Sequence, residues 1–206
     1  MSTSLAENYG ALYNEVLLKV AELLERHIES HLDAVDRIDR VSARAKSPDR
    51  FLAKAEKVDE DGQLKYSNPL AQIHDQIGAR VTVLYVSDVP NVKAAIQDYF
   101  HAIEWQEKKP ESDSEFGYFG EHYILDIPDD TIPAGLEDRC PKFFELQIKT
   151  LFQHAWSEAH HDIGYKAPRK LTSLEIRQMA FSAAQAWGAD QIFLQLVSEL
   201  IPNNDA

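Results

Sequence analysis

Hydrophobic residues recur with a helical period near both ends of the chain. From residue 12 to residue 38 an apolar side chain occurs every three or four positions, which predicts one long helix or two joined helices. Ser47-Pro48 then stops or restarts the helix, because proline fits a first helical turn and breaks a helix interior. The same period in residues 151–163 and 174–200 predicts two further helices, with Pro168 between them.

The middle of the chain has a different pattern. Residues 80–86 are compact and β-branched, and residues 122–127 and 143–148 also have the pattern of strands. Residues 89–103 have a helical pattern, and the polar stretch 108–116 is expected to form a loop. Strand, helix, strand and strand between terminal helices are typical of the α+β class. We therefore predict a single mixed β-sheet flanked by helices, with long N- and C-terminal helices.

Length and composition limit the class of protein. The chain has 206 residues, of which 44% are hydrophobic, so it can fill a sizeable core and is not expected to be disordered. It has no apolar run of the ~18 to 20 residues that span a membrane, and no signal-peptide pattern at its start. The single cysteine, Cys140, excludes an internal disulfide and a cysteine-based zinc site. We expect a cytoplasmic protein that does not bind a membrane.

Charge is unevenly distributed along the chain. Lys and Arg number 21 against 34 Asp and Glu, a net charge of −13, so the surface as a whole repels nucleic acid and anionic membranes. The stretch from Arg37 to Lys57 is the exception, because seven basic residues there face only three acidic ones. This basic stretch predicts either a local site for an anion or a solvated helix surface, and composition alone does not separate the two.

The third predicted strand carries polar side chains on one face. Because side chains alternate along a strand, its residues divide into two sets. Phe144, Leu146 and Ile148 share one face, and Glu145, Gln147 and Lys149 share the other. The polar set either faces water or lines a cleft, and the strand taken alone favours a solvated face.

An acidic residue lies before the first predicted strand. Asp75 and Arg80 bracket Gly78, which permits a close approach of the backbone. If Asp75 shares a sheet with Glu145, the two carboxylates can hold Mg²⁺ that bridges substrate phosphates. The alternative is a helix-capping aspartate with a surface arginine, and the local sequence by itself favours it.

Histidines could also suggest a metal site. His154, Glu158 and His161 fall at positions i, i+4 and i+7, on one stripe of the predicted helix. No HExxH sequence is present, and zinc needs converging ligands, so we do not favour a zinc or hydrolase metal site.

Four separated segments, taken in order, resemble the synthetase domain of RelA/SpoT-type alarmone synthetases, especially the small stand-alone ones. The segments are Arg44-Ala45-Lys46-Ser47-Pro48 with Lys54, Asp75-Gln76-Ile77-Gly78-Ala79-Arg80, Gly117-Tyr118-Phe119-Gly120-Glu121-His122, and Glu145-Leu146-Gln147-Ile148-Lys149-Thr150. Trp156, His161 and Tyr165-Lys166 follow at the spacing of the family. The resemblance covers about residues 40–166. It implies an N-terminal helical segment (1–40), a nucleotidyltransferase-like synthetase core (41–166) and a C-terminal helical extension (167–206).

The resemblance implies a GTP/GDP diphosphokinase, a transferase that moves the β,γ-pyrophosphate of ATP to the 3′-hydroxyl of GDP or GTP. The product, (p)ppGpp, is the alarmone of the stringent response. Such chemistry depends on positioning and charge neutralisation, which the basic stretch can supply. Because few residues precede Arg44, no hydrolase domain is expected, and we expect synthesis only.

The resemblance also implies roles for individual residues. Arg44, Lys46 and Lys54 would hold ATP phosphates, and Arg80 would pack on or beside the adenine. Asp75 would bind Mg²⁺, and Glu145 would bind it too or accept the 3′-hydroxyl proton. Tyr118 would stack on the acceptor base, with His122, Gln147 and Lys149 as further contacts to the acceptor or its phosphates.

The third segment departs from the family pattern on the acceptor side. Phe119, Gly120 and Glu121 replace the usual polar or basic residue and serine. Acceptors such as an adenosine nucleotide or the 3′ end of tRNA, and a non-catalytic nucleotide-binding module, therefore stay open. The long C-terminal helix is rich in alanine, so we expect a homo-oligomer, whereas an antitoxin partner does not follow from the residues.

Overall fold

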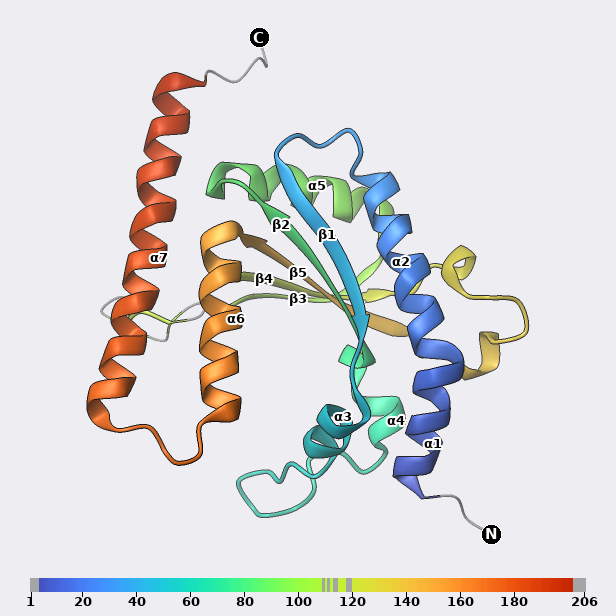
Figure 1. The fold of residues 1–206 in the computed structure, drawn as a ribbon. Helices are drawn as coiled ribbons and strands as arrows, with labels where there is room; N and C mark the ends of the chain where they lie inside the picture. The colour runs from blue at the N-terminus through green and yellow to red at the C-terminus, as the bar shows by residue number, and fades with distance from the viewer. Residues whose placement is uncertain (1–3, 109, 111, 113–114, 118–119, 202–206) are drawn as a thin grey trace.

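A five-stranded sheet in the order β1-β2-β5-β4-β3 forms the centre of the molecule, with helices around it (Figure 1). This computed structural model describes residues 4–108, 110, 112, 115–117 and 120–201. The strands are β1 (Ile38–Ala45), β2 (Ile77–Val83), β3 (Ala102–Lys108), β4 (Gly120–Asp126) and β5 (Phe143–Thr150). β2 and β5 pair in parallel, whereas the other neighbours pair antiparallel. The predicted α+β class with a single mixed sheet is confirmed.

Long helices occupy both ends of the chain, as the hydrophobic period predicts. The helices are α1 (Leu5–Leu12), α2 (Leu18–His31), α3 (Pro48–Ala55), α4 (Pro69–Gln72), α5 (Val89–Tyr99), α6 (Leu151–Lys166) and α7 (Ser173–Leu200). A π-helical turn, Tyr13–Leu17, joins α1 to α2. α6 and α7 lie side by side and are connected at one end by a short loop (Figure 1). Each begins with a capping box, at Thr150 and Thr172 respectively, which satisfies free N–H groups of the first turn.

The helix predicted over residues 12–38 ends at His31, and β1 follows instead. Arg37 adopts a left-handed backbone conformation with φ 63° just before the strand. Along β1, Val41, Ala43 and Ala45 pack against the core, so the apolar positions have changed to a period of two. The basic side chains of this stretch therefore lie partly on a strand, at Arg40 and Arg44, and partly on α3, at Arg50 and Lys54.

A second strand was also missed. The helix predicted over residues 89–103 ends at Tyr99, and β3 then runs from Ala102 to Lys108, into the stretch predicted as a loop. Most of β3 is exposed because it is the edge strand of the sheet. Its side chains show little of the buried-to-exposed contrast by which a strand is predicted. The strand expected at residues 80–86 begins three residues earlier, at Ile77, and ends at Val83.

The two faces of the sheet differ in their surroundings. α2 packs against β1 and β2, and α5 packs against β5, on the face where the core lies. Phe144, Leu146 and Ile148 of β5 are buried in this core, as their alternation predicts. The opposite face carries the polar side chains of β5 and remains available for a site.

α7 lies at the edge of the molecule, with α6 on one side of it (Figure 1). Ala183, Asp190 and Val197 are its buried residues. Its other side exposes large apolar groups, most of all Leu174, Phe181, Ile192 and Leu200. None of the helices in the described part of the chain is long and apolar enough to span a membrane.

Candidate active site

The polar face of the sheet forms the floor of a cleft. Two adjoining hollows, of about 440 and 520 Å³, open over it. Their shared lining residues are Arg44, Lys46, Arg50, Asp75, Arg80, Glu145 and Gln147. The volumes are in the range of sites that hold a small molecule. The polar side chains of β5 thus line a cleft and are not on the solvated face that the strand alone favoured.

Strand register sets the order of the side chains across the floor. Arg44 on β1 lies opposite Gly78 on β2, which lies opposite Glu145 on β5. Gly78 carries no side chain, and a Cβ built there meets nothing within 4 Å. The floor between Arg44 and Glu145 is therefore open. In the next row, Arg80 lies opposite Gln147.

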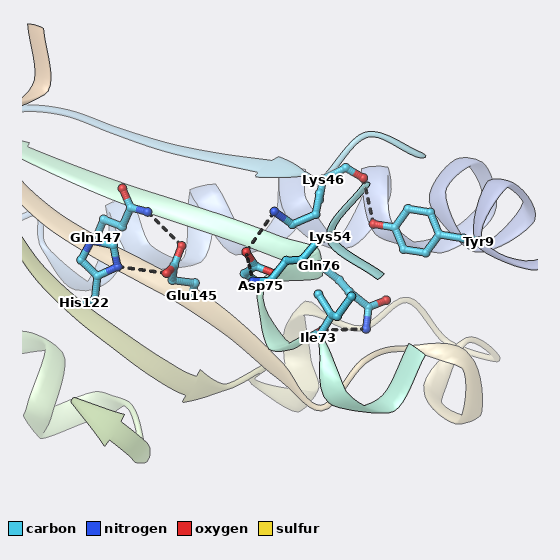
Figure 2. A network of polar contacts seen from close by, with 9 residues as sticks. All are labelled: Tyr9, Lys46, Lys54, Ile73, Asp75, Gln76, His122, Glu145 and Gln147. Carbon is cyan, nitrogen blue, oxygen red and sulfur yellow. Dashed lines mark hydrogen bonds and ion pairs between the residues drawn. The ribbon is translucent and has the colours of Figure 1, made fainter. Parts of the chain in front are cut away.

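Asp75 holds two lysines at the end of the cleft near α3. The ammonium groups of Lys46 and Lys54 both lie 2.9 Å from the Oδ2 atom of Asp75 (Figure 2 shows Asp75 with Lys46 and Lys54). The other oxygen, Oδ1, is buried and has no hydrogen-bond partner. The aspartate is thus an ion-paired residue of the cleft, and the alternative of a helix cap is not what the structure shows.

The backbone of Lys46 is fixed from both sides. Its N–H donates to the carbonyl of Gln76 at 2.8 Å, and its carbonyl accepts from the hydroxyl of Tyr9 at 2.8 Å (Figure 2). Tyr9 is fully buried and stacks on Phe51 of α3, with 3.6 Å between ring centroids. The N-terminal helix therefore holds in place the segment that carries the first lysine.

Glu145 is the second carboxylate of the cleft. Its Oε1 lies 2.9 Å from Nδ1 of His122, and its Oε2 accepts from Nε2 of Gln147 at 2.9 Å (Figure 2). Burial acts to raise the pKa of Glu145. Hydrogen bonds from His122 and Gln147, with the charge of Lys54, outweigh it and lower this pKa to about 2. Glu145 is therefore ionised at neutral pH.

The two carboxylates share one pocket and could hold a divalent cation. Asp75 and Glu145 line both hollows, and Lys54, which is paired with Asp75, also lowers the pKa of Glu145. The unpartnered Oδ1 of Asp75 suits a hard cation such as Mg²⁺. No group of three or more His, Cys, Asp or Glu ligands occurs among the described residues. A cation here would take its remaining ligands from phosphates and water, as Mg²⁺ commonly does.

Arg80 points into the cleft but is held by α6. Its Nη1 donates to Oε1 of Glu158 and lies at the same distance, 2.7 Å, from Nδ1 of His154. Its Nη2 donates to Oε1 of Gln147 at 3.3 Å. Packing of Arg80 on a base remains a prediction, and any such contact has to accommodate these partners.

Lys149 is buried at the end of the floor nearest α6. Only 2% of the residue is exposed, and its Nζ donates to Oγ of Ser157 at 3.0 Å. Burial, together with the nearby charge of Arg80, lowers the pKa of Lys149 to about 7. The last predicted residue, Tyr118, lies outside the described residues.

Several residues that line the cleft had no individual role assigned from the sequence. They are Arg50 and Lys57 from the basic stretch, and Ser157, Glu158, His160 and His161 from α6. The stripe formed by His154, Glu158 and His161 was visible in the sequence. It was considered as a zinc site and set aside, whereas its first two members bind an arginine.

Fold and site together define a class of protein: an α+β domain whose sheet carries a cleft lined with cations and two carboxylates, suited to a polyphosphate. A family model described as a region found in RelA and SpoT proteins matches residues 43–170, more than half of the chain. The chain therefore belongs to the RelA/SpoT family.

Solved structures with a similar fold include those of small alarmone synthetases. The small alarmone synthetase 1 from Bacillus subtilis bound to its product pppGpp has a TM-score of 0.73 at 19% identity, covering 95% of this chain and 97% of that one. A GTP pyrophosphokinase family protein from Streptococcus pneumoniae has a TM-score of 0.72 at 20% identity, covering 96% of each chain. At such identities the likeness shows the fold. No curated protein sequence matches the chain significantly.

The buried lysine predicts a pH-dependent stability. Lys149 has its pKa lowered from 10.5 to about 7 in the folded protein, so the unfolded chain binds more protons between these values. The cost of burying it is complete below pH 7 and disappears towards pH 10.5. Lys149→Met should therefore be more stable than the wild type at pH 7 in urea unfolding. The difference should shrink by at most about 1.4 kcal/mol per pH unit as pH rises.

Lys19→Met, at an exposed position of α2, controls for the loss of a positive charge. A stability difference between Lys149→Met and the wild type that stays constant from pH 7 to pH 10 would contradict the assignment.

Proposed function

We propose that the protein is a (p)ppGpp synthetase, which transfers the β,γ-pyrophosphate of ATP to the 3′-hydroxyl of GDP or GTP. The observation that carries the proposal is the cleft of cations around two carboxylates, in a chain of net charge −13. Membership of the RelA/SpoT family supports the proposal. The acceptor is proposed from the similar fold of a synthetase whose structure holds pppGpp.

The cations of the cleft bind and orient the donor. Arg44 comes from β1, Lys46 from the segment after it and Lys54 from α3. Arg50, also on α3, adds a further positive charge beside them. Together they neutralise the triphosphate, whose charge otherwise opposes the approach of a phosphorylated acceptor. Because most of these groups sit on regular elements or are ion-paired, little ordering is needed when ATP binds.

We propose that Asp75 and Glu145 hold Mg²⁺. The bound cation would neutralise charge on the transferred phosphates. Glu145 has a second candidate role, to accept the proton of the 3′-hydroxyl. Its pKa of about 2 is far below the value suited to a base at neutral pH, so the arrangement in the structure favours the ligand role.

A transfer assay tests the function. The protein is incubated with γ-labelled ATP and Mg²⁺ together with GDP, GTP, ADP, ATP or tRNA in separate reactions. Label is expected on GDP or GTP. Label on an adenosine nucleotide or on tRNA would overturn the proposed acceptor, and label on none of them would favour a non-catalytic binding module.

Replacing Glu145 tests the site itself. Glu145→Gln removes a charge that serves either as ligand or as base, so turnover should fall by at least ~10²-fold, while binding of ATP largely survives. Glu22→Gln, on an exposed part of α2, should leave turnover unchanged. Retained synthesis in Glu145→Gln would reject the assignment.

The metal role of Asp75 has a readout other than activity. In calorimetry, Mg²⁺ should strengthen binding of a non-hydrolysable ATP analogue to the wild type and have little effect on Asp75→Asn. The variant keeps the cations of the cleft but lacks the carboxylate that the metal requires. An equal effect of Mg²⁺ on both proteins would exclude Asp75 as a ligand.

We also propose a homo-oligomer formed through α7. Its exposed apolar residues, including Phe181 and Ile192, form more hydrophobic surface than a solvated helix normally shows. Sedimentation should give a species larger than the monomer for the wild type and a monomer for the double variant Phe181→Glu, Ile192→Glu. Leu18→Glu, at an exposed leucine of α2, should behave as the wild type does. A monomeric wild type would refute the proposal.

A further inference from the structure

A continuous chain of polar contacts crosses the floor of the cleft. It runs from Glu158 on α6 to Arg80 on β2, then to Gln147 and Glu145 on β5, and ends at His122 on β4. The successive distances are 2.7, 3.3, 2.9 and 2.9 Å. Figure 2 shows the last three residues of the chain, with both oxygens of Glu145 engaged. The four elements are thus linked through side chains as well as through the sheet.

The chemical groups in this series of contacts fix which side chain donates and which accepts at each hydrogen bond. An arginine has only hydrogen-bond donors, and an ionised glutamate has only acceptors. The amide of Gln147 lies between Arg80 and Glu145, so its oxygen must face the arginine and its NH₂ group must face the carboxylate. Rotation of the amide by 180° would place its oxygen against Glu145 and its NH₂ group against Arg80, and both contacts would become repulsive. Arg80 therefore determines the orientation of the Gln147 amide, and with it the hydrogen bond that Gln147 donates to Glu145.

Arg80 is itself held by two residues one helical turn apart on α6. Burial, with the charge of Arg80, lowers the pKa of His154, so the imidazole is neutral at neutral pH and its Nδ1 accepts. Burial acts to raise the pKa of Glu158, but the hydrogen bond from Arg80 outweighs it and the pKa is lowered. Glu158 is accordingly a carboxylate, and its charge-assisted contact is the one ion pair of Arg80 among the described residues.

We propose that Glu158 is a positioning residue for the transfer reaction: through Arg80 and Gln147 it fixes the orientation of the Glu145 carboxylate. This inference rests on the proposed function for its kinetic consequence. Glu158 is not placed at the reacting atoms. Its effect is to keep Arg80 from turning away, because the neutral imidazole of His154 and the amide oxygen of Gln147 hold a guanidinium less strongly than a carboxylate does.

Two variants of Glu158 separate the effect of losing the hydrogen bond to Arg80 from the effect of losing the negative charge. Glu158→Ala and Glu158→Gln remove the same negative charge, but only the glutamine retains an oxygen that accepts from Arg80. We expect kcat to fall about tenfold or more in Glu158→Ala and by less than about threefold in Glu158→Gln, because only the glutamine can still hold Arg80. The KM for ATP should stay near the wild-type value in Glu158→Gln, which keeps a partner for Arg80, and in Glu158→Ala it should rise by less than kcat falls.

The separate effects on kcat and on the KM for ATP distinguish a positioning role from general damage to the fold. A residue with a merely structural role would lower kcat and thermal stability alike, and would raise the KM for ATP as the cleft deforms. Glu22→Ala, at an exposed position of α2, is the matched control and should match the wild type. Equal kcat values for Glu158→Ala and Glu158→Gln, or a rise in KM that accounts for the loss, would overturn the proposal.

A second readout does not depend on activity. In nitrogen-15 NMR spectra of the wild type, the guanidinium of Arg80 should rotate slowly about its Nε–Cζ bond and give separate Nη resonances, with Arg80→Lys used for assignment. The resonances should remain separate in Glu158→Gln and merge in Glu158→Ala. Separate resonances in Glu158→Ala would refute the restraint. If the wild type transfers no pyrophosphate, the proposed function fails, while the spectra still decide whether Glu158 holds Arg80.

Discussion

One carboxylate holds together the cationic end of the cleft. Lys46 and Lys54 both lie 2.9 Å from the same oxygen of Asp75. Without that oxygen, the two ammonium groups would repel each other in a partly buried space, where charges interact several times more strongly than in water. The pair is therefore arranged before an anion arrives, and the rest of the site depends on this arrangement. Positive charge can then be concentrated in one place on a strongly acidic chain.

Sheet topology brings the second carboxylate to the first. Asp75 precedes β2 and Glu145 lies near the start of β5, and these two strands are the one parallel pair among the described strands. Parallel pairing places their starts at the same edge of the sheet, with Gly78 opposite Glu145. Because the residue between Arg44 and Glu145 is a glycine, no side chain fills the space between cation and carboxylate. The site is thus a consequence of strand order and register.

Local patterns predicted most of the fold, but not its two edge strands. From Phe144 to Lys149 of β5 the apolar residues alternate with polar ones, so the buried apolar face could be predicted, whereas the burial of Lys149 could not. In β1 the apolar members are Ile38, Val41, Ala43 and Ala45, and two alanines flanking an arginine equally fit the surface of a helix that continues from α2. β3 is largely exposed on both faces, so burial leaves no alternation in its sequence to detect.

The contacts of the site depend on residues far apart in sequence, which explains why its individual segments left alternatives open. Glu158 and Arg80 are 78 positions apart, and the residues next to either one in the sequence do not predict the contact between them. The spacing of His154 and Glu158 predicts that they share a helix face, and that face could receive either a metal ion or a guanidinium. Arg80 resolves the choice, because its Nη1 lies 2.7 Å from both side chains and brings a positive charge to the place where a zinc ion would lie. The position of Arg80 on β2 therefore determines that this face of α6 binds a guanidinium and not a metal ion.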